Sequence, residues 1–157
     1  METDASVMNR FLVEVFNEIL KTEERSLTGD YPDLSIREIH LIEEVCAAAG
    51  GKRDNRSTAI AAAQRVTAGT LTTAAGALER KGYLERRRDE KDRRAVRILP
   101  TAAARAANAL HARFHREMVD GLLAVLTEEE TGVLVRALGH LAGFFQEKDR
   151  QNRPIRG

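Results

Sequence analysis

The most constraining feature of this 157-residue chain is a succession of short elements in its middle third. Hydrophobic spacing and turn residues predict a helix, a short turn, a second helix, a glycine and two strand-like runs, at residues 57–64, 65–66, 67–81, 82, 83–88 and 95–99. The turn between the two strand-like runs is rich in arginine and acidic residues. A helix, a turn, a helix and an arginine-tipped ribbon make up the layout of a winged helix-turn-helix.

Charge is distributed unevenly, although the net charge is only +1. Residues 52–105 hold fourteen Lys or Arg against six Asp or Glu, whereas residues 1–51 hold four against eleven. A basic segment of this kind attracts the phosphate backbone of nucleic acids. The distribution therefore predicts a DNA-facing lobe joined to a lobe that does not touch DNA. A basic surface of solvated charges is the alternative.

The flanking sequence predicts further amphipathic helices, over residues 4–24, 35–49, 101–125 and 127–148, with a loop over residues 25–34. Capping signals mark three helix starts, at Ser35 with Glu38, at Thr67, and at Thr127 with Glu130. The predicted fold is mainly α with a small β-wing. We expect one domain over residues 1–157, with residues 34–100 as the DNA-binding lobe and residues 1–33 and 101–148 as dimerisation helices.

Dimerisation is expected because the flanking helices carry broad apolar faces outside the DNA unit. Two winged helices related by a two-fold axis reach successive major grooves, about 34 Å apart, on a pseudo-palindromic site. An intramolecular helix bundle is the alternative use of these faces. The single cysteine, Cys46, is expected to be buried and unreactive. No apolar run approaches membrane-spanning length, so a cytoplasmic protein without membrane contact is expected.

The predicted second helix of the central unit has an apolar side and a side of small or hydroxyl-bearing residues. Leu71, Ala75 and Leu78 are expected to face inward. The outward positions are then Gly69, Thr70, Thr73, Gly76 and Ala77. Small residues let a helix backbone approach base edges, and threonines bond phosphates or bases and contact thymine methyls.

Residues 78–97, Leu-Glu-Arg-Lys-Gly-Tyr-Leu-Glu-Arg-Arg-Arg-Asp-Glu-Lys-Asp-Arg-Arg-Ala-Val-Arg, resemble the recognition-helix end and wing of the MarR family of bacterial regulators. Residues 34–40, 66–73 and 110–119 resemble the FabT-like subgroup, the repressors of fatty-acid synthesis genes. The resemblance implies a homodimeric repressor. Its implied co-repressor is an acyl chain on acyl carrier protein, bound between the dimer helices and the winged helix.

Candidate DNA contacts combine this resemblance with charge and position. At the wing tip, Arg93 and Arg94 suit a narrow minor groove, where the negative potential is strongest. The resemblance implies that Asp92 pairs with Arg94 and fixes the wing. The remaining candidates are phosphate-contacting cations and residues of the recognition helix: Lys81, Arg86, Arg88, Thr67, Gly69, Thr70 and Thr73.

Histidines open a second hypothesis about control. His111 and His115 are four residues apart and share a helix face. The resemblance brings His40 and Glu24 near that face, at positions that match the ligands of zinc-sensing relatives. Three imidazoles and one carboxylate close a tetrahedral zinc site. A zinc-responsive repressor using Glu24, His40, His111 and His115 is the alternative, and a hydrogen-bonded His–Glu cluster without metal is the plainer reading.

Two other classes of function receive less support. A zinc hydrolase using His111 and His115 lacks the adjacent glutamate of a His-Glu-x-x-His site, so no enzyme is predicted. A module that binds only other proteins would keep its function when Arg93 and Arg94 are replaced by alanine. The predicted partners are duplex DNA, a second copy of the chain and acyl carrier protein.

Overall fold

The computed structural model of the protein describes residues 3–152. Its elements, in chain order, are α1 (Asp4–Asp30), α2 (Ile36–Ala47), a π-helical turn η1 (Ala48–Lys52), α3 (Ser57–Ala63), α4 (Ala68–Arg80), β1 (Leu84–Arg88), β2 (Val96–Pro100), α5 (Ala102–Leu123) and α6 (Glu128–Asn152). The predicted mainly helical fold with a small β-wing is confirmed. Predictions that cover residues 1–2 and 153–157 lie outside the described residues.

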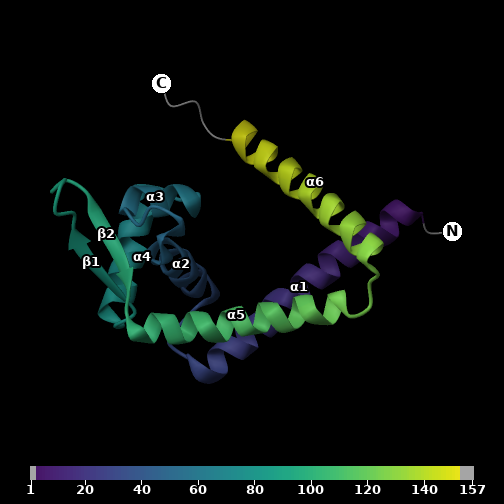
Figure 1. Cartoon of the computed structure of the whole chain (residues 1–157), viewed down its shortest axis with the longest axis horizontal. Coiled ribbons are helices and arrows are strands. Elements are labelled where there is room, and N and C mark those ends of the chain that lie inside the picture. The colour runs from purple at the N-terminus through teal and green to yellow at the C-terminus, as the bar shows by residue number, and fades with distance from the viewer. Residues whose placement is uncertain (1–2, 153–157) are drawn as a thin grey trace. The chain divides into compact units, whose positions relative to one another are not determined.

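The chain divides into two compact units, with the boundary after Phe114, within α5. The first unit contains the helix-turn-helix and the wing, with α2, α3 and α4 gathered beside the two strands (Figure 1). The second contains the rest of α5 and all of α6. The predicted single domain, with residues 34–100 as the DNA-binding lobe and residues 1–33 and 101–148 as dimerisation helices, stays a prediction.

The core of the first unit is aliphatic. Its largest fully buried side chains come from α2, α3, α4 and both strands: Ile39, Ile42, Val45, Ile60, Leu71, Leu78, Leu84 and Ile98. Ala104 and Ala107 bring the first turns of α5 against the same cluster. Burial of a Leu or Ile side chain contributes about 1.5–3 kcal/mol. This core holds the helix-turn-helix and the wing together as one body.

The turn between α3 and α4 lies at the predicted place. Arg65 adopts a left-handed conformation with a φ of 54°, which turns the chain sharply between the two helices. Thr67 then caps α4, because its hydroxyl oxygen accepts a hydrogen bond from the Thr70 amide at 3.1 Å. The capping boxes at Ser35 and Thr127 are also formed, with Glu38 and Glu130 respectively.

The wing is an antiparallel pair in which Leu84 is opposite Pro100 and Arg88 is opposite Val96. Gly82 connects α4 to β1 with a φ of +85°, as the predicted helix stop requires. The Tyr83 amide donates to the Leu78 carbonyl at 2.9 Å and so closes the helix end. Helix α4 is thereby joined to the wing by one short turn.

Two helix ends in the first unit differ from the prediction, and in the second unit α6 ends at Asn152 instead of residue 148. The first helix continues to Asp30 instead of ending near residue 24, because Leu27 is buried against the core and extends the helix through the predicted loop. The end of α2 is also not a simple stop at two glycines. The chain makes a π-helical turn there, and only Gly51 has a positive φ, at 78°.

The two long helices α1 and α6 both leave apolar side chains exposed. Along α1 only Glu23 and Leu27 are buried, while Phe11 and Phe16 are 53% and 60% exposed. In the second unit, α6 buries none of its residues, and Phe144 and Phe145 are both more than half exposed. Within residues 3–152, none of the helices is long and apolar enough to cross a membrane.

Replacement of Gly82 by alanine tests the turn between α4 and the wing. An alanine Cβ at residue 82 meets no atom within 4 Å, so the cost comes from the positive φ alone. We expect a loss of about 1–2 kcal/mol in the free energy of unfolding. Gly69→Ala is the matched control, because its Cβ also meets nothing within 4 Å but its residue is helical. That change is expected to stabilise by up to about 1 kcal/mol. Urea unfolding followed by circular dichroism measures both, and equal effects would contradict the assignment.

Candidate nucleic-acid interface

The outer face of α4 carries the predicted helix contacts. Thr67, Gly69, Thr70 and Thr73 are all exposed, as expected from the inward stripe of Leu71, Ala75 and Leu78. Gly76, which the sequence predicted to face outward, is buried instead. The guanidinium groups of Arg80 and Arg86 lie over it, 3.6 and 3.7 Å from the position of a Cβ. The absence of a side chain at residue 76 therefore gives these arginines a place against the helix.

A two-point ion pair joins the wing to α4. Arg86 of β1 donates from its Nη2 to Glu79 Oε1 at 3.1 Å and from its backbone amide to Glu79 Oε2 at 3.0 Å. These hydrogen bonds hold the pKa of the Glu79 carboxyl below its usual value. Arg86 was predicted to contact phosphate, and the structure gives it a fixed position between the helix and the wing. A phosphate contact by Arg86 stays a prediction.

The turn at the wing tip is organised around Asp89. This carboxylate is 9% exposed and accepts hydrogen bonds from the backbone amides of Lys91 and Asp92, at 2.7 and 3.0 Å. Its other oxygen contacts Nε of Arg97. The two amide bonds, followed by the Arg97 contact, lower the pKa of Asp89 to about 2. Asp89 is a structural residue of the interface that sequence reasoning missed.

Arg97 extends this arrangement to the helix-turn-helix. Its Nη1 donates to Asn55 Oδ1 at 2.5 Å, and the Ile98 amide donates to the Asn55 carbonyl at 3.0 Å. The wing is thus anchored through β2 to the chain segment just before α3. The predicted Asp92–Arg94 pair takes a different form, in which Asp92 Oδ1 accepts from the Arg94 backbone amide at 3.0 Å. This contact shapes the turn at the wing tip and does not engage the guanidinium.

The remaining predicted cations divide into two kinds. Arg88, Arg93 and Arg94, which were predicted to contact DNA from the wing, are exposed there. Lys81 is engaged within the protein, because its Nζ donates to the Asp33 carbonyl at 2.5 Å and to Glu38 Oε1 at 2.8 Å. It joins the end of α4 to the start of α2.

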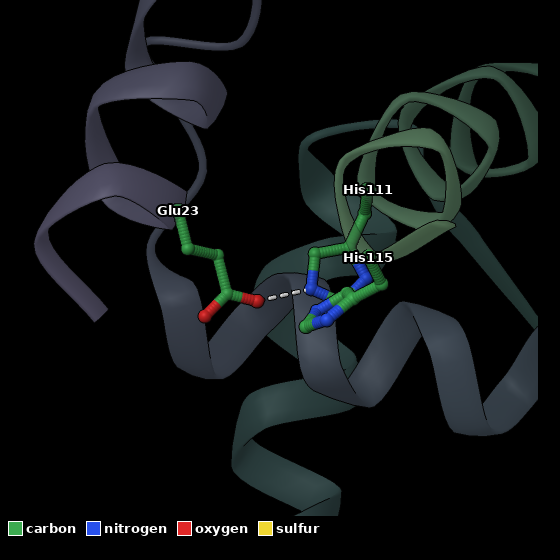
Figure 2. Close-up of side chains that lie close together, drawn as sticks. All are labelled: Glu23, His111 and His115. Carbon is green, nitrogen blue, oxygen red and sulfur yellow. Dashed lines mark hydrogen bonds and ion pairs between the residues drawn. The ribbon is translucent and has the colours of Figure 1, made fainter. Parts of the chain in front are cut away.

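A buried carboxylate lies beside the predicted histidines. Glu23 is 3% exposed, and its Oε1 lies 3.2 Å from His40 Nε2 and also contacts His111 Nε2. Figure 2 draws Glu23 of α1 with His111 of α5, and with His115 one turn further along α5. The predicted ligand Glu24 is exposed, so the carboxylate at this place is its neighbour. A one-residue step rotates a helical side chain by about 100°, which explains the error.

Two cavities lie in the first unit away from the wing. One, of about 330 Å³, is lined mainly by apolar atoms between α2, the turn before α4, and α4 itself, by Arg37, His40, Leu41, Gln64, Val66, Thr70, Leu71 and Ala74. The other, of about 460 Å³, is lined by Cys46 with residues of α2 and α5. Cys46 is half-buried, and burial raises the pKa of its thiol, which disfavours the reactive thiolate.

Comparison with known proteins identifies the fold. The sequence profile of the MarR family matches residues 53–96, which contain the helix-turn-helix and most of the wing. The structure of Streptococcus pneumoniae FabT in complex with DNA is similar over 92% of this chain and 99% of that one, with a TM-score of 0.82 and 37% sequence identity. The chain belongs to the MarR family. Its similarity to FabT supports the FabT-like subgroup within it.

Two further similar proteins share less with this chain. AbsC, a MarR family transcriptional regulator from Streptomyces coelicolor, has a TM-score of 0.71 at 20% identity, over 94% of this chain and 98% of its own. At that identity the likeness concerns the fold. YwhA of Bacillus subtilis, an HTH-type transcriptional regulator, is 34% identical over 71 residues, 45% of this chain. The chain spans about half the length of this curated relative.

The pKa of Asp89 leads to a pH-dependent prediction for the MarR wing. The carboxyl has a pKa of about 2 in the folded protein, below the ordinary value of 3.8. A depressed pKa adds stability that is fully present above about pH 4 and is lost as the pH falls through 2. We expect Asp89→Asn to lower the urea midpoint at pH 5 and to remove part of the decline between pH 4 and pH 2. Urea midpoints across that range measure this, and identical pH profiles would contradict the role of Asp89.

The Glu79–Arg86 pair leads to a prediction for hydrogen exchange. Glu79→Ala removes the acceptor of the Arg86 amide, so we expect that amide to exchange faster with solvent. Glu85→Ala is the control, because Glu85 pairs with Arg87, which follows Arg86 in β1, and not with Arg86 itself. Amide exchange by NMR measures both variants. Unchanged exchange of Arg86 in Glu79→Ala would show that the contact does not hold the wing.

Proposed function

We propose that this protein is a homodimeric DNA-binding repressor of transcription that acts in the cytoplasm, with fatty-acid-synthesis genes as its targets. The observation that carries the proposal is the joint exposure of the α4 threonines and the wing arginines on a MarR scaffold. The similarity to FabT in complex with DNA, at 37% identity over 92% of the chain, supports both the DNA and the fatty-acid role. The α4 face suits a major groove, and Arg93 and Arg94 suit the adjacent minor groove.

Exposed apolar helices support the dimer. Among the 25 residues of α6 none is fully buried, so packing within the described part of the chain stabilises this helix little. The exposed phenylalanines of α1 and α6 are of the kind that subunit interfaces bury. A second copy is the occupant that fits best, because a two-fold pair of winged helices matches a pseudo-palindromic operator.

Control by an acyl ligand, delivered by acyl carrier protein, is the finer part of the proposal. The cavity of about 330 Å³ between α2 and α4 supports it, because its size and apolar lining are those of ligand sites. Thr70, Leu71 and Ala74 of α4 form one wall, so an occupant would contact the recognition helix directly. Arg37 at the same cavity supplies a cation for an anionic group. A ligand acts here only by binding the DNA-competent state more tightly than the other.

Zinc control is the second candidate, and the cluster around Glu23 favours it. One carboxylate and the imidazoles of His40 and His111 are ligand types that zinc prefers, and the two rings lie 5.5 Å apart between centroids. Bound zinc would supply a cross-link between α1, α2 and α5. The Gln64 side chain donates to the His40 carbonyl at 3.4 Å, which connects this cluster to the end of α3.

DNA binding is tested with wing variants and labelled genomic fragments. Arg93→Ala with Arg94→Ala removes two cations for each wing, and we expect weaker binding and a shallower salt dependence, by about 0.9 for each lost phosphate contact. The melting temperature should stay near that of the wild type, because both side chains are exposed. Binding equal to wild type would contradict the DNA-binding role. Retained fragments from upstream of lipid-synthesis genes support the fatty-acid role, and their absence counts against it.

The choice of effector is tested in the same assay, with metal-free protein, added zinc and long-chain acyl carrier protein. A response to the acyl protein alone supports the first reading, and a response to zinc alone supports the second. Adjacent glutamates give a matched pair of variants for the zinc arm. Glu23→Gln should abolish zinc binding in calorimetry, whereas Glu24→Gln, at an exposed position, should not. Equal zinc binding by both variants would exclude the Glu23 cluster as the metal site.

A further inference from the structure

A third cavity lies between α3, α4 and the wing. It measures about 250 Å³, and its polar lining consists of three arginines and three hydroxyl-bearing residues: Arg56, Arg86, Arg94, Ser57, Thr58 and Thr72. Ala68 and Ala75 of α4 form part of its surface, and their small side chains leave the space open. A water molecule takes about 30 Å³ of liquid volume, so the cavity has room for a phosphate group and several waters.

The lining of this cavity is strongly cationic. Its three arginines are accompanied by no acidic residue among the lining side chains. Two of the three are held in place from outside the cavity, Arg56 by Asp54 through Nε at 2.6 Å and Arg86 by Glu79. A guanidinium has five N–H donors, so these ion pairs leave further donors for a ligand. The cavity is therefore a pre-positioned site for an anion.

The backbone also fixes the first arginine in this arrangement. Arg56 forms a β-bridge with Arg97 of β2, and its amide donates to Asp54 Oδ1 at 2.9 Å. The hydroxyl groups of Ser57 and Thr58 follow directly along the chain. The Thr72 hydroxyl, on the facing side of α4, bonds to the Ala68 carbonyl at 2.8 Å. Three separate segments thus contribute to one cavity, and a single bound group would contact all of them.

The position of the cavity identifies the anion. On a duplex, one sugar-phosphate strand separates the major groove from the adjacent minor groove. A recognition helix in the first groove and a wing tip in the second must therefore straddle that strand. The cavity lies between these two elements, where the strand has to pass. Free phosphate would meet the same donors. Only a phosphate of the DNA backbone, however, would also be aligned with both the recognition helix and the wing.

We propose that this cavity is a seat for one phosphodiester group of duplex DNA, with Arg56, Ser57 and Thr58 as contacts additional to the wing and the recognition helix. The proposal rests on the DNA-binding role proposed above. Contacts to phosphate carry no sequence information but fix the protein's register on the duplex. The seat would therefore set how deeply α4 and the wing tip enter their grooves.

Salt-dependent binding to a short labelled duplex of mixed sequence tests the seat. Between about 50 and 200 mM salt, Arg56→Gln should reduce the slope of log affinity against log salt by about 0.9 for each occupied seat. Ser57→Ala with Thr58→Val removes two neutral donors, so affinity should fall about tenfold with the slope unchanged. Arg87→Gln is the matched control, because Arg87 is an exposed wing arginine outside the cavity, and its slope should equal that of the wild type.

The outcomes separate this proposal from the DNA-binding role itself. If wild type binds duplex DNA and both cavity variants bind with its affinity and slope, the seat is wrong and the DNA-binding role stands. If wild type binds no duplex, both fall. Arg56→Lys covers the case in which Arg56→Gln fails to fold: it keeps the charge, so the slope should persist while affinity drops through loss of the planar fork.

A second measurement distinguishes the DNA backbone from a free anion. Amide NMR signals of residues 57, 58 and 72 should shift when the duplex is added, and should stay unchanged with inorganic phosphate at the same ionic strength. Shifts with inorganic phosphate and none with the duplex would assign the cavity to a small anion and overturn the proposal.

Discussion

Rotation of α4 about its own axis depends on a narrow apolar stripe. Leu71, Ala75 and Leu78 are at most 1% exposed, and they are spaced so that one side of the helix is fully committed to the core. Each leucine contributes about 1.5–3 kcal/mol through burial, far more than any single surface contact of the interface. The exposed threonines face outward because the opposite side is fixed. The Glu79–Arg86 contact therefore joins the wing to a helix whose orientation the core has already set.

Three acidic residues of the basic segment hold arginine side chains in place. Asp54 contacts Arg56, Glu79 contacts Arg86, and Asp89 contacts Arg97. These pairs fix the geometry of the wing and of the segment before α3, while Arg88, Arg93 and Arg94 extend from the wing surface. The Asp54 and Glu79 pairs are at the surface and add little stability, so their main effect is to fix positions, whereas the buried Asp89 also stabilises the wing. Excess positive charge is thereby presented on a rigid support.

Local sequence signals predicted the elements well and the contacts between them less well. The capping residues Ser35, Thr67 and Thr127, and the stop at Gly82, depend on neighbours within a few positions, so the pattern contains the answer. The burial of Gly76 under Arg86, and the central place of Asp89, depend on how the wing folds back on α4. No periodicity encodes such contacts.

The histidine cluster shows the same limit at finer scale. The resemblance brought the correct helices together, but it named Glu24 where Glu23 is the buried residue. The apolar pattern of α1 was read to residue 24, and the burial of Leu27, which fixes the rotation of the helix end, was not visible in it. A tertiary contact of one leucine decides which of two adjacent carboxylates meets the histidines.

The exposed surface of α6 links the stability of the proposed dimer to the concentration of the protein. None of the residues of α6 is fully buried, and in the proposed dimer the second copy that covers them would bind according to mass action. Thermal resistance should then climb as the sample is concentrated, in contrast to a self-sufficient domain. In a cell, newly made chains at low copy number would stay longer as monomers. The apolar side chains of their helices would then remain exposed to proteases and chaperones.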